Sequence, residues 1–268
     1  MKIDRIESFL IGGGYVVRLT TDTGLTGVGQ TACWGYPEAV SSIVTAFERY
    51  LIGQDPLRIE HHWQHLYRMS PFRGTALSGA VSAIDIALWD IKGKALNQSV
   101  SSLLGGYRDR VTTYASGALM RPMDLEYLAE AGPRLVGMGF KQMKTQMGAE
   151  STPAKEVERM KVMRESVGPD IDLMCDINQL WDVNQAIDIG TRLEDYHLYW
   201  LEDVVAHDDY QGLARVADAL TTPIAAGEYH YGIRPFRHML EHRSIDVVMI
   251  DLLRVGGITQ WKKLAGMA

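Results

Sequence analysis

The chain has 268 residues, of which 46% are hydrophobic and 22% are charged, and its formal net charge is −6. This length is enough for a large core, in one domain or in a large domain with a smaller one. The acidic balance argues against a nucleic-acid partner. No run approaches the roughly 18 apolar residues of a membrane span, and the first residues lack the apolar stretch of a signal peptide. The two cysteines lie far apart and outside any metal-binding pattern, so we expect reduced thiols in a cytoplasmic protein.

The first part of the chain has the pattern of strands followed by helices. Strand-forming residues come first, and apolar residues at three- to four-residue spacing follow. The expected strands cover 3–11, 15–20 and 25–30, and the expected helices cover 37–51, 58–68 and 75–96. This order predicts an α+β domain over residues 1–110.

After residue 110 the pattern changes to a regular alternation of short strands and helices. The expected strands cover 111–117, 141–146, 172–177, 198–202, 223–227 and 246–251. The expected helices cover 122–136, 154–167, 183–194, 209–219, 234–242 and 258–268. Such repeated units predict a parallel sheet, either in a TIM barrel or in a doubly wound open sheet. The open sheet usually carries a glycine-rich phosphate turn after its first strand, and none is present, which favours a barrel domain over residues 111–268.

Three acidic residues stand at the carboxyl ends of consecutive expected strands. Asp176, Glu202 and Glu228 follow one another at intervals of 26 residues, which is one strand–helix unit per step. In a parallel barrel these ends converge on one rim, where barrel enzymes place their active sites. Carboxylates held together raise one another's pKa, and Mg²⁺ prefers carboxylate oxygens and relieves this repulsion. A single acid at a strand end is commonly a helix cap or a solvated loop residue, but three at this spacing predict a magnesium site.

Two further residues are candidates for catalytic roles on the same rim. Lys144 ends the strand before Asp176, and strand periodicity puts it on one face with Gln146. A lysine beside a metal site can have a depressed pKa and act as a base. Asp251 ends the sixth strand, where a fourth acid would be redundant as a ligand and fits better as the partner that orients a base.

At these residues the chain resembles a known family. Asp176-Ile177-Asn178, Glu202-Asp203 and Gly227-Glu228 resemble the three metal-ligand motifs of the enolase superfamily. The segment 251–261 resembles the sixth-strand motif of its mandelate racemase/muconate lactonizing enzyme family, notably in the acid-sugar dehydratases. The segment 87–106 resembles that family's junction between capping domain and barrel.

The resemblance implies a fold, a cofactor and a reaction. The expected fold is α/β, a modified TIM barrel with an N-terminal α+β capping domain. Mg²⁺ would bind a small carboxylate substrate, such as an acid sugar, and stabilise the enolate formed when a base removes the α-proton. By analogy with the family we also expect a homo-oligomer. To substrate binding we assign Gln146, Asn178, His230, Arg254, Arg73 and Trp34, the last two from loops that correspond in position to the family's specificity loops.

Two departures from the family pattern bear on the reaction. The family usually has a second lysine, the base, where this chain has Gln146, which disfavours a two-base racemisation. The branch also has a histidine at the end of a seventh strand, paired with the residue that corresponds to Asp251, and the sequence ends at Ala268 before such a strand. We therefore expect either a longer protein or a barrel truncated after its sixth strand. The leading interpretation is an acid-sugar dehydratase, with a racemase, epimerase or cycloisomerase, or an inactive family member, as alternatives.

Overall fold

The computed structural model describes residues 1–32 and 36–268, so Trp34 lies outside the described residues. The chain forms two compact units. The first contains Met1–Asp109, Glu228–Pro235 and Ile250–Ala268, and the second contains Arg110–Gly227 and Phe236–Met249. The predicted domain division at residue 110 stays a prediction. Among the described residues, no helix is long and apolar enough to cross a membrane.

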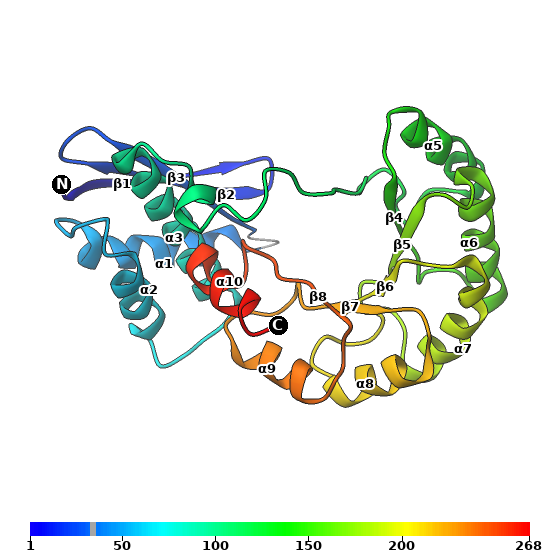
Figure 1. The fold of residues 1–268 in the computed structure, drawn as a ribbon. Helices are drawn as coiled ribbons and strands as arrows, with labels where there is room; N and C mark the ends of the chain where they lie inside the picture. Colours follow the sequence, from blue (N-terminus) through cyan, green and yellow to red (C-terminus); the bar gives the residue numbers. More distant parts are fainter. Residues whose placement is uncertain (33–35) are drawn as a thin grey trace. The chain divides into compact units, whose positions relative to one another are not determined.

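The first unit is built on a three-stranded antiparallel sheet in the order β1-β2-β3 (Figure 1). Its strands are β1 (Ile3–Ile11), β2 (Gly14–Thr21) and β3 (Thr26–Ala32), and its helices are α1 (Pro37–Leu51), α2 (Ile59–Arg68), α3 (Thr75–Leu96), α4 (Val100–Leu103) and α10 (Gly257–Ala265). Helix α3 packs directly on β3 because two positions of that strand, Gly27 and Gly29, have no side chain. A Cβ atom at either position would collide with the carbonyl oxygen of Ala87 or Ala83.

Helix α10 is tied to α3 by hydrogen bonds at its amino end. The Gly256 N–H donates to Ser82 Oγ at 2.9 Å, and the Thr259 N–H donates to Asp85 Oδ2 at 3.0 Å. Trp89 Nε1 donates to Thr259 Oγ1 at 2.9 Å. Asp85 is 2% exposed, and its other carboxylate oxygen has no hydrogen-bond partner among the described residues. A carboxyl group is therefore buried at a helix N-terminus with a hydrogen-bond partner for only one of its oxygens.

Replacing Asp85 with asparagine should remove a pH dependence of the folding free energy. Burial raises the pKa of Asp85 to about 7, although the hydrogen bonds from Thr259 oppose the rise. The native state therefore holds a proton that the unfolded state loses near pH 4, and Asp85 makes the protein less stable as the pH rises from about 4 to about 7. The full shift corresponds to a free energy on the order of 4 kcal/mol. We expect Asp85→Asn to be increasingly more stable than the wild type from pH 5 to pH 8 in urea unfolding.

Asp90→Asn is the matched control, because Asp90 lies on the same helix with its side chain 33% exposed and paired with Lys94. That substitution should change stability by an amount that does not depend on pH in this range. A stability difference between the wild type and Asp85→Asn that stays constant from pH 5 to pH 8 would contradict the prediction.

The second unit is a parallel sheet in the order β4-β5-β6-β7-β8 (Figure 1). Its strands are β4 (Gln142–Gln146), β5 (Asp172–Asp176), β6 (Trp200–Glu202), β7 (Ile224–Ala226) and β8 (Val247–Val248). The connecting helices are α5 (Leu125–Gly137), α6 (Pro153–Val167), α7 (Val183–Leu193) and α8 (Tyr210–Ala219), a 3-10 turn spans Glu194–Tyr196, and α9 (Arg234–Glu241) follows β7. A core of buried apolar residues, including Met143, Leu173 and Leu201, lies between the sheet and the helices.

Two expected strands are much shorter than the pattern predicted. The strand expected over 111–117 is reduced to one parallel bridge between Ala115 and Met143. Residues 111–113 are exposed, so no packing holds them in an extended ladder. The strand expected over 246–251 is reduced to Val247–Val248, although the Met249 N–H still donates to Ala226 O at 3.1 Å.

Candidate metal and substrate site

The candidate site is a row of polar side chains at the carboxyl ends of β4, β5 and β6. The register pairs Gln146 with Asp176 and Asp176 with Glu202, so the last residues of the three strands are direct neighbours. Lys144 lies two residues before Gln146 and therefore shares its face of the sheet. The spacing in the sequence predicted that strand ends would gather these residues, and the register explains how it happens.

Lys144 forms ion pairs with two carboxylates of this row. Its Nζ lies 2.5 Å from Glu202 Oε1 and 3.3 Å from Asp176 Oδ2. The three side chains are 10%, 0% and 4% exposed, in the order Lys144, Glu202 and Asp176. Trp200, on the same face of β6, donates its Nε1–H to Glu202 Oε2 at 3.0 Å. The centre of the Tyr114 ring lies 5.6 Å from Lys144 Nζ, and the ring packs edge-on against Trp200. Two aromatic side chains therefore lie next to the charged row.

Burial and mutual charge set the protonation of these groups. Burial raises the pKa of Glu202 to about 7; Lys144 opposes the rise and Asp176 adds to it. Burial disfavours the charge on Lys144, but Glu202 and Asp176 outweigh it and raise the pKa of Lys144 above its usual value. The sequence suggested a depressed pKa for Lys144, whereas its contacts in the structure raise this pKa.

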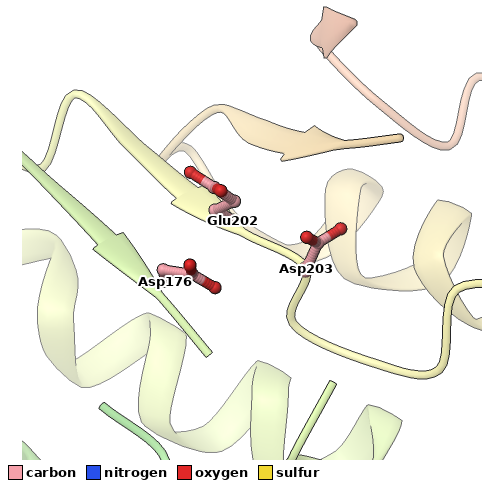
Figure 2. Close-up of side chains that lie close together, drawn as sticks. All are labelled: Asp176, Glu202 and Asp203. Carbon is pink, nitrogen blue, oxygen red and sulfur yellow. The ribbon is translucent and has the colours of Figure 1, made fainter. Parts of the chain in front are cut away.

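The structure adds Asp203 to the acidic cluster. One oxygen each of Asp176, Glu202 and Asp203 lie within 4.8 Å of one another, and all three residues are buried (Figure 2). Asp203 follows β6 with a positive φ of 45°, and its N–H donates to Ala225 O at 2.9 Å. Asp203 belongs to the Glu202-Asp203 motif, but strand alternation alone directs these two consecutive side chains to opposite faces and so predicts no role for Asp203 beside Glu202. The positive φ bends the chain at this point, and sequence periodicity does not reveal such a bend.

The residues of the cluster fit a hard divalent cation. Mg²⁺ takes oxygen ligands at about 2 Å in octahedral geometry, so neighbouring ligand oxygens are about 3 Å apart. The three carboxylate oxygens lie within 4.8 Å of one another, so small side-chain rotations would bring them to that spacing around an ion. The ammonium group of Lys144 already lies between two of these acids, which indicates that the site stabilises positive charge.

Asn178 lies next to this cluster, and Asp176 holds it there. The Asn178 N–H donates to Asp176 Oδ1 at 2.9 Å, and the Asn178 Oδ1 accepts from Arg121 at 2.9 Å. Both Asn178 and Gln146 are half-buried. Their assignment to substrate binding stays a prediction.

Three predicted site residues meet in the first unit. Glu228 follows β7 by two residues, and its carbonyl oxygen accepts from Arg254 Nη1 at 2.9 Å. Arg254 Nη1 also lies 3.7 Å from Glu228 Oε1, and Arg254 Nε lies 3.3 Å from Asp251 Oδ2. The Leu253 N–H donates to the other oxygen of Asp251 at 2.7 Å. This geometry holds the Asp251 carboxylate in a fixed orientation, and its role with a base stays a prediction.

The other two candidates in the first unit occupy different environments. His230 is buried, at 5% exposure, two residues after Glu228. Arg73 is exposed; its guanidinium donates to Ser70 O in its own loop and lies 4.6 Å from the centre of the Tyr67 ring. A role in substrate binding remains a prediction for both.

Comparisons with known proteins place these features in a family. Residues 14–105 match the mandelate racemase / muconate lactonizing enzyme N-terminal domain, and residues 126–268 match the enolase C-terminal domain-like model. The chain is 33% identical over 255 residues to an arabinonate dehydratase of Saccharolobus solfataricus, covering 93% of this chain and 68% of that protein. It is 34% identical over 277 residues to a D-galactarolactone cycloisomerase of Agrobacterium fabrum, covering 100% of this chain and 70% of that protein.

A solved structure extends the comparison to three dimensions. The L-talarate dehydratase from Polaromonas sp. JS666, complexed with Mg and L-glucarate, superposes with a TM-score of 0.89 at 29% identity, covering 95% of this chain and 72% of that one. The fold class predicted from the sequence, an α/β barrel domain with an N-terminal α+β domain, is confirmed. The chain therefore belongs to the mandelate racemase/muconate lactonizing enzyme family of the enolase superfamily.

Proposed function

We propose that this protein is a Mg²⁺-dependent dehydratase of acid sugars. The observation that carries the proposal is the buried row of Lys144, Asp176 and Glu202 at the carboxyl ends of three adjacent parallel strands. Support comes from the family and from relatives named as arabinonate dehydratase and L-talarate dehydratase, the latter solved with Mg and L-glucarate. The substrate is a small carboxylate with a hydrogen on its α-carbon and a hydroxyl on its β-carbon.

Two of the metal's ligands would come from the acidic cluster. Asp176 and Glu202 would supply carboxylate oxygens from neighbouring strands, and we assign Glu228 as the third ligand because the Gly227-Glu228 motif resembles the family's third metal-ligand motif. When bound, Mg²⁺ supplies positive charge that favours the enolate form of the substrate.

The protein's own residues would bind and orient the substrate and support removal of its α-proton. Lys144 directs its ammonium group into the acidic row and is placed to pair with a substrate carboxylate. Trp200 and Tyr114 place aromatic rings beside the charged row, and such apolar neighbours would strengthen its charge interactions by limiting contact with water. Asp251 is oriented by Arg254 and Leu253 to hold a base that removes the α-proton. Loss of the β-hydroxyl as water then gives an enol that rearranges to a 2-keto-3-deoxy acid.

The second candidate is an isomerase on the same scaffold, which the similarity to a cycloisomerase supports. The same α-proton is removed in that case, but the enolate collapses without loss of water. The third candidate is an inactive family member, which Gln146 supports, since an amide does not abstract a proton.

The decisive test is a reaction in D₂O with Mg²⁺ and a panel of aldonic and aldaric acids, followed by NMR. We expect a 2-keto-3-deoxy acid that carries deuterium at C3, because the enol takes its new proton from solvent. Deuterium at the α-carbon of recovered substrate, with no loss of water, would instead identify an isomerase. Calorimetric Mg²⁺ binding with neither outcome across the panel would identify an inactive member.

A further inference from the structure

Arg121 bridges the ends of the two strands that carry Lys144 and Asp176. It lies in the segment before α5, and its Nε donates to Met147 O at 2.6 Å. Its Nη2 donates to Ile177 O at 3.1 Å and to Asn178 Oδ1 at 2.9 Å. Met147 directly follows β4, and Ile177 directly follows β5. One planar guanidinium therefore fixes the spacing of two strand ends at the candidate site.

The contact with Asn178 extends this bridge to a carboxylate of the acidic cluster. Asn178 has a positive φ of 49°, so its backbone bends back towards the strand end. In this conformation its N–H donates to Asp176 Oδ1 at 2.9 Å. Hydrogen bonds thus run from Arg121 through the side chain and backbone of Asn178 to Asp176. Asp176 Oδ2, the other oxygen, faces Lys144 at 3.3 Å.

We propose that Arg121 is a positioning residue that orients the Asp176 carboxylate for a divalent cation. The inference rests on the proposed metal site and extends it to Arg121, whose hydrogen bonds go to Met147, Ile177 and Asn178 and not to the acidic cluster or Lys144. Partners that orient a ligand typically contribute 10- to 100-fold to metal affinity, because a carboxylate free to rotate loses that orientation entropy on binding.

Arg164 provides a matched control within the same unit. It also donates to backbone carbonyl groups on either side of a strand, Ile171 O at 2.7 Å, Gly168 O at 3.1 Å and Tyr196 O at 3.0 Å. These carbonyl groups precede β5 and β6, at the opposite ends of the strands from the acidic cluster. Arg164 thus has the structural role of Arg121 without its connection to a candidate ligand.

The test compares Arg121→Lys with Arg164→Lys by calorimetric titration of the protein with Mg²⁺. A lysine keeps the charge, but it lacks the planar fork that reaches two strand ends at once. We expect the Kd for Mg²⁺ to rise 10- to 100-fold in Arg121→Lys and to stay within twofold of the wild type in Arg164→Lys. Both variants should lose thermal stability to a similar extent. Equal changes in Kd for the two variants would overturn the proposal, since a general loosening of the unit would then explain them.

A double-mutant cycle tests the route through Asn178. Asn178→Gly removes the acceptor side chain and retains a backbone that tolerates positive φ. We expect Arg121→Lys to raise the Kd by less than threefold when it is added to Asn178→Gly, because the connection is already broken. Fully additive effects would overturn the route. A wild-type protein that binds no Mg²⁺ would overturn the proposed function itself, whereas normal wild-type binding with an unchanged Kd in Arg121→Lys would overturn only the role of Arg121.

Discussion

Replacing Lys144 with methionine should lower kcat by about 10²- to 10³-fold, the range seen when one preorganised electrostatic donor is removed from an active site. Methionine keeps the length and apolar stem of the side chain and removes only its charge and donors. The ammonium group lies 2.5 Å from Glu202 Oε1 and 3.3 Å from Asp176 Oδ2. Among the described residues, no other cationic side chain forms an ion pair with either carboxylate. A substrate carboxylate that approaches the row would then lose its counter-charge. Steady-state kinetics on the acid sugar identified by the panel would measure the effect.

The same substitution should change how the protein responds to Mg²⁺. Without Lys144, two buried carboxylates face each other with no compensating charge, and breaking one side of such a pair costs about 3–5 kcal/mol of stability. Mg²⁺ binds the folded state and should therefore raise the Tm of Lys144→Met more than it raises the Tm of the wild type. Differential scanning calorimetry with and without Mg²⁺ measures both values.

Lys141→Met is the control for Lys144→Met. Lys141 precedes β4 by one residue and is exposed, so its loss should leave kcat and the Mg²⁺ response unchanged. A wild-type kcat in Lys144→Met would show that Lys144 has no role in the reaction. An equal loss of kcat in Lys141→Met would show that the effect comes from disturbing β4 and not from the Lys144 side chain.

Periodicity was sufficient to predict most of the fold. The three-to-four spacing over 75–96 gave a helix with the bounds of α3, and the alternation after residue 110 gave the parallel order of β4 to β8. The prediction of strands was wrong where strand-forming residues have no neighbouring side chains to pack against. Val111 has a strong strand preference, but it is 75% exposed, and the expected strand around it is only a bridge at Ala115.

The candidate site was predictable to the extent that strand register determines it. Lys144, Asp176 and Glu202 come together because each stands on the same face at the end of neighbouring strands, and residue spacing reveals that arrangement. Asp203 joins them through a positive φ that no pattern signals. Arg121 was missed for a different reason. Two of its three partners are backbone carbonyl oxygens, which every residue type provides. The sequence therefore contains no acidic partner from which a role for Arg121 could be predicted.

Replacing Glu202 with glutamine should raise the Kd for Mg²⁺ by more than 100-fold, beyond the range expected for a residue that only orients a ligand. Glutamine has the same shape and keeps an oxygen that accepts from Trp200 or Lys144, but it removes the negative charge that a hard cation needs. Asp172→Asn is the control, because Asp172 begins β5 at the end opposite Asp176 and bonds Gln142 there. Calorimetric titration should give the wild-type Kd for that variant.

The choice of the third ligand follows from the same titration. If Glu228 is the ligand, Glu228→Gln should match Glu202→Gln, and Asp203→Asn should raise the Kd by less than tenfold, the effect of removing one nearby negative charge. The reverse order would assign the third position to Asp203, whose carboxylate the structure groups with Asp176 and Glu202. The metal would then be held by two strands in place of three. A Kd that changes in neither variant, while Glu202→Gln abolishes binding, would leave Asp176 and Glu202 as the protein's two ligands, which is sufficient for Mg²⁺ when substrate and water complete its octahedron.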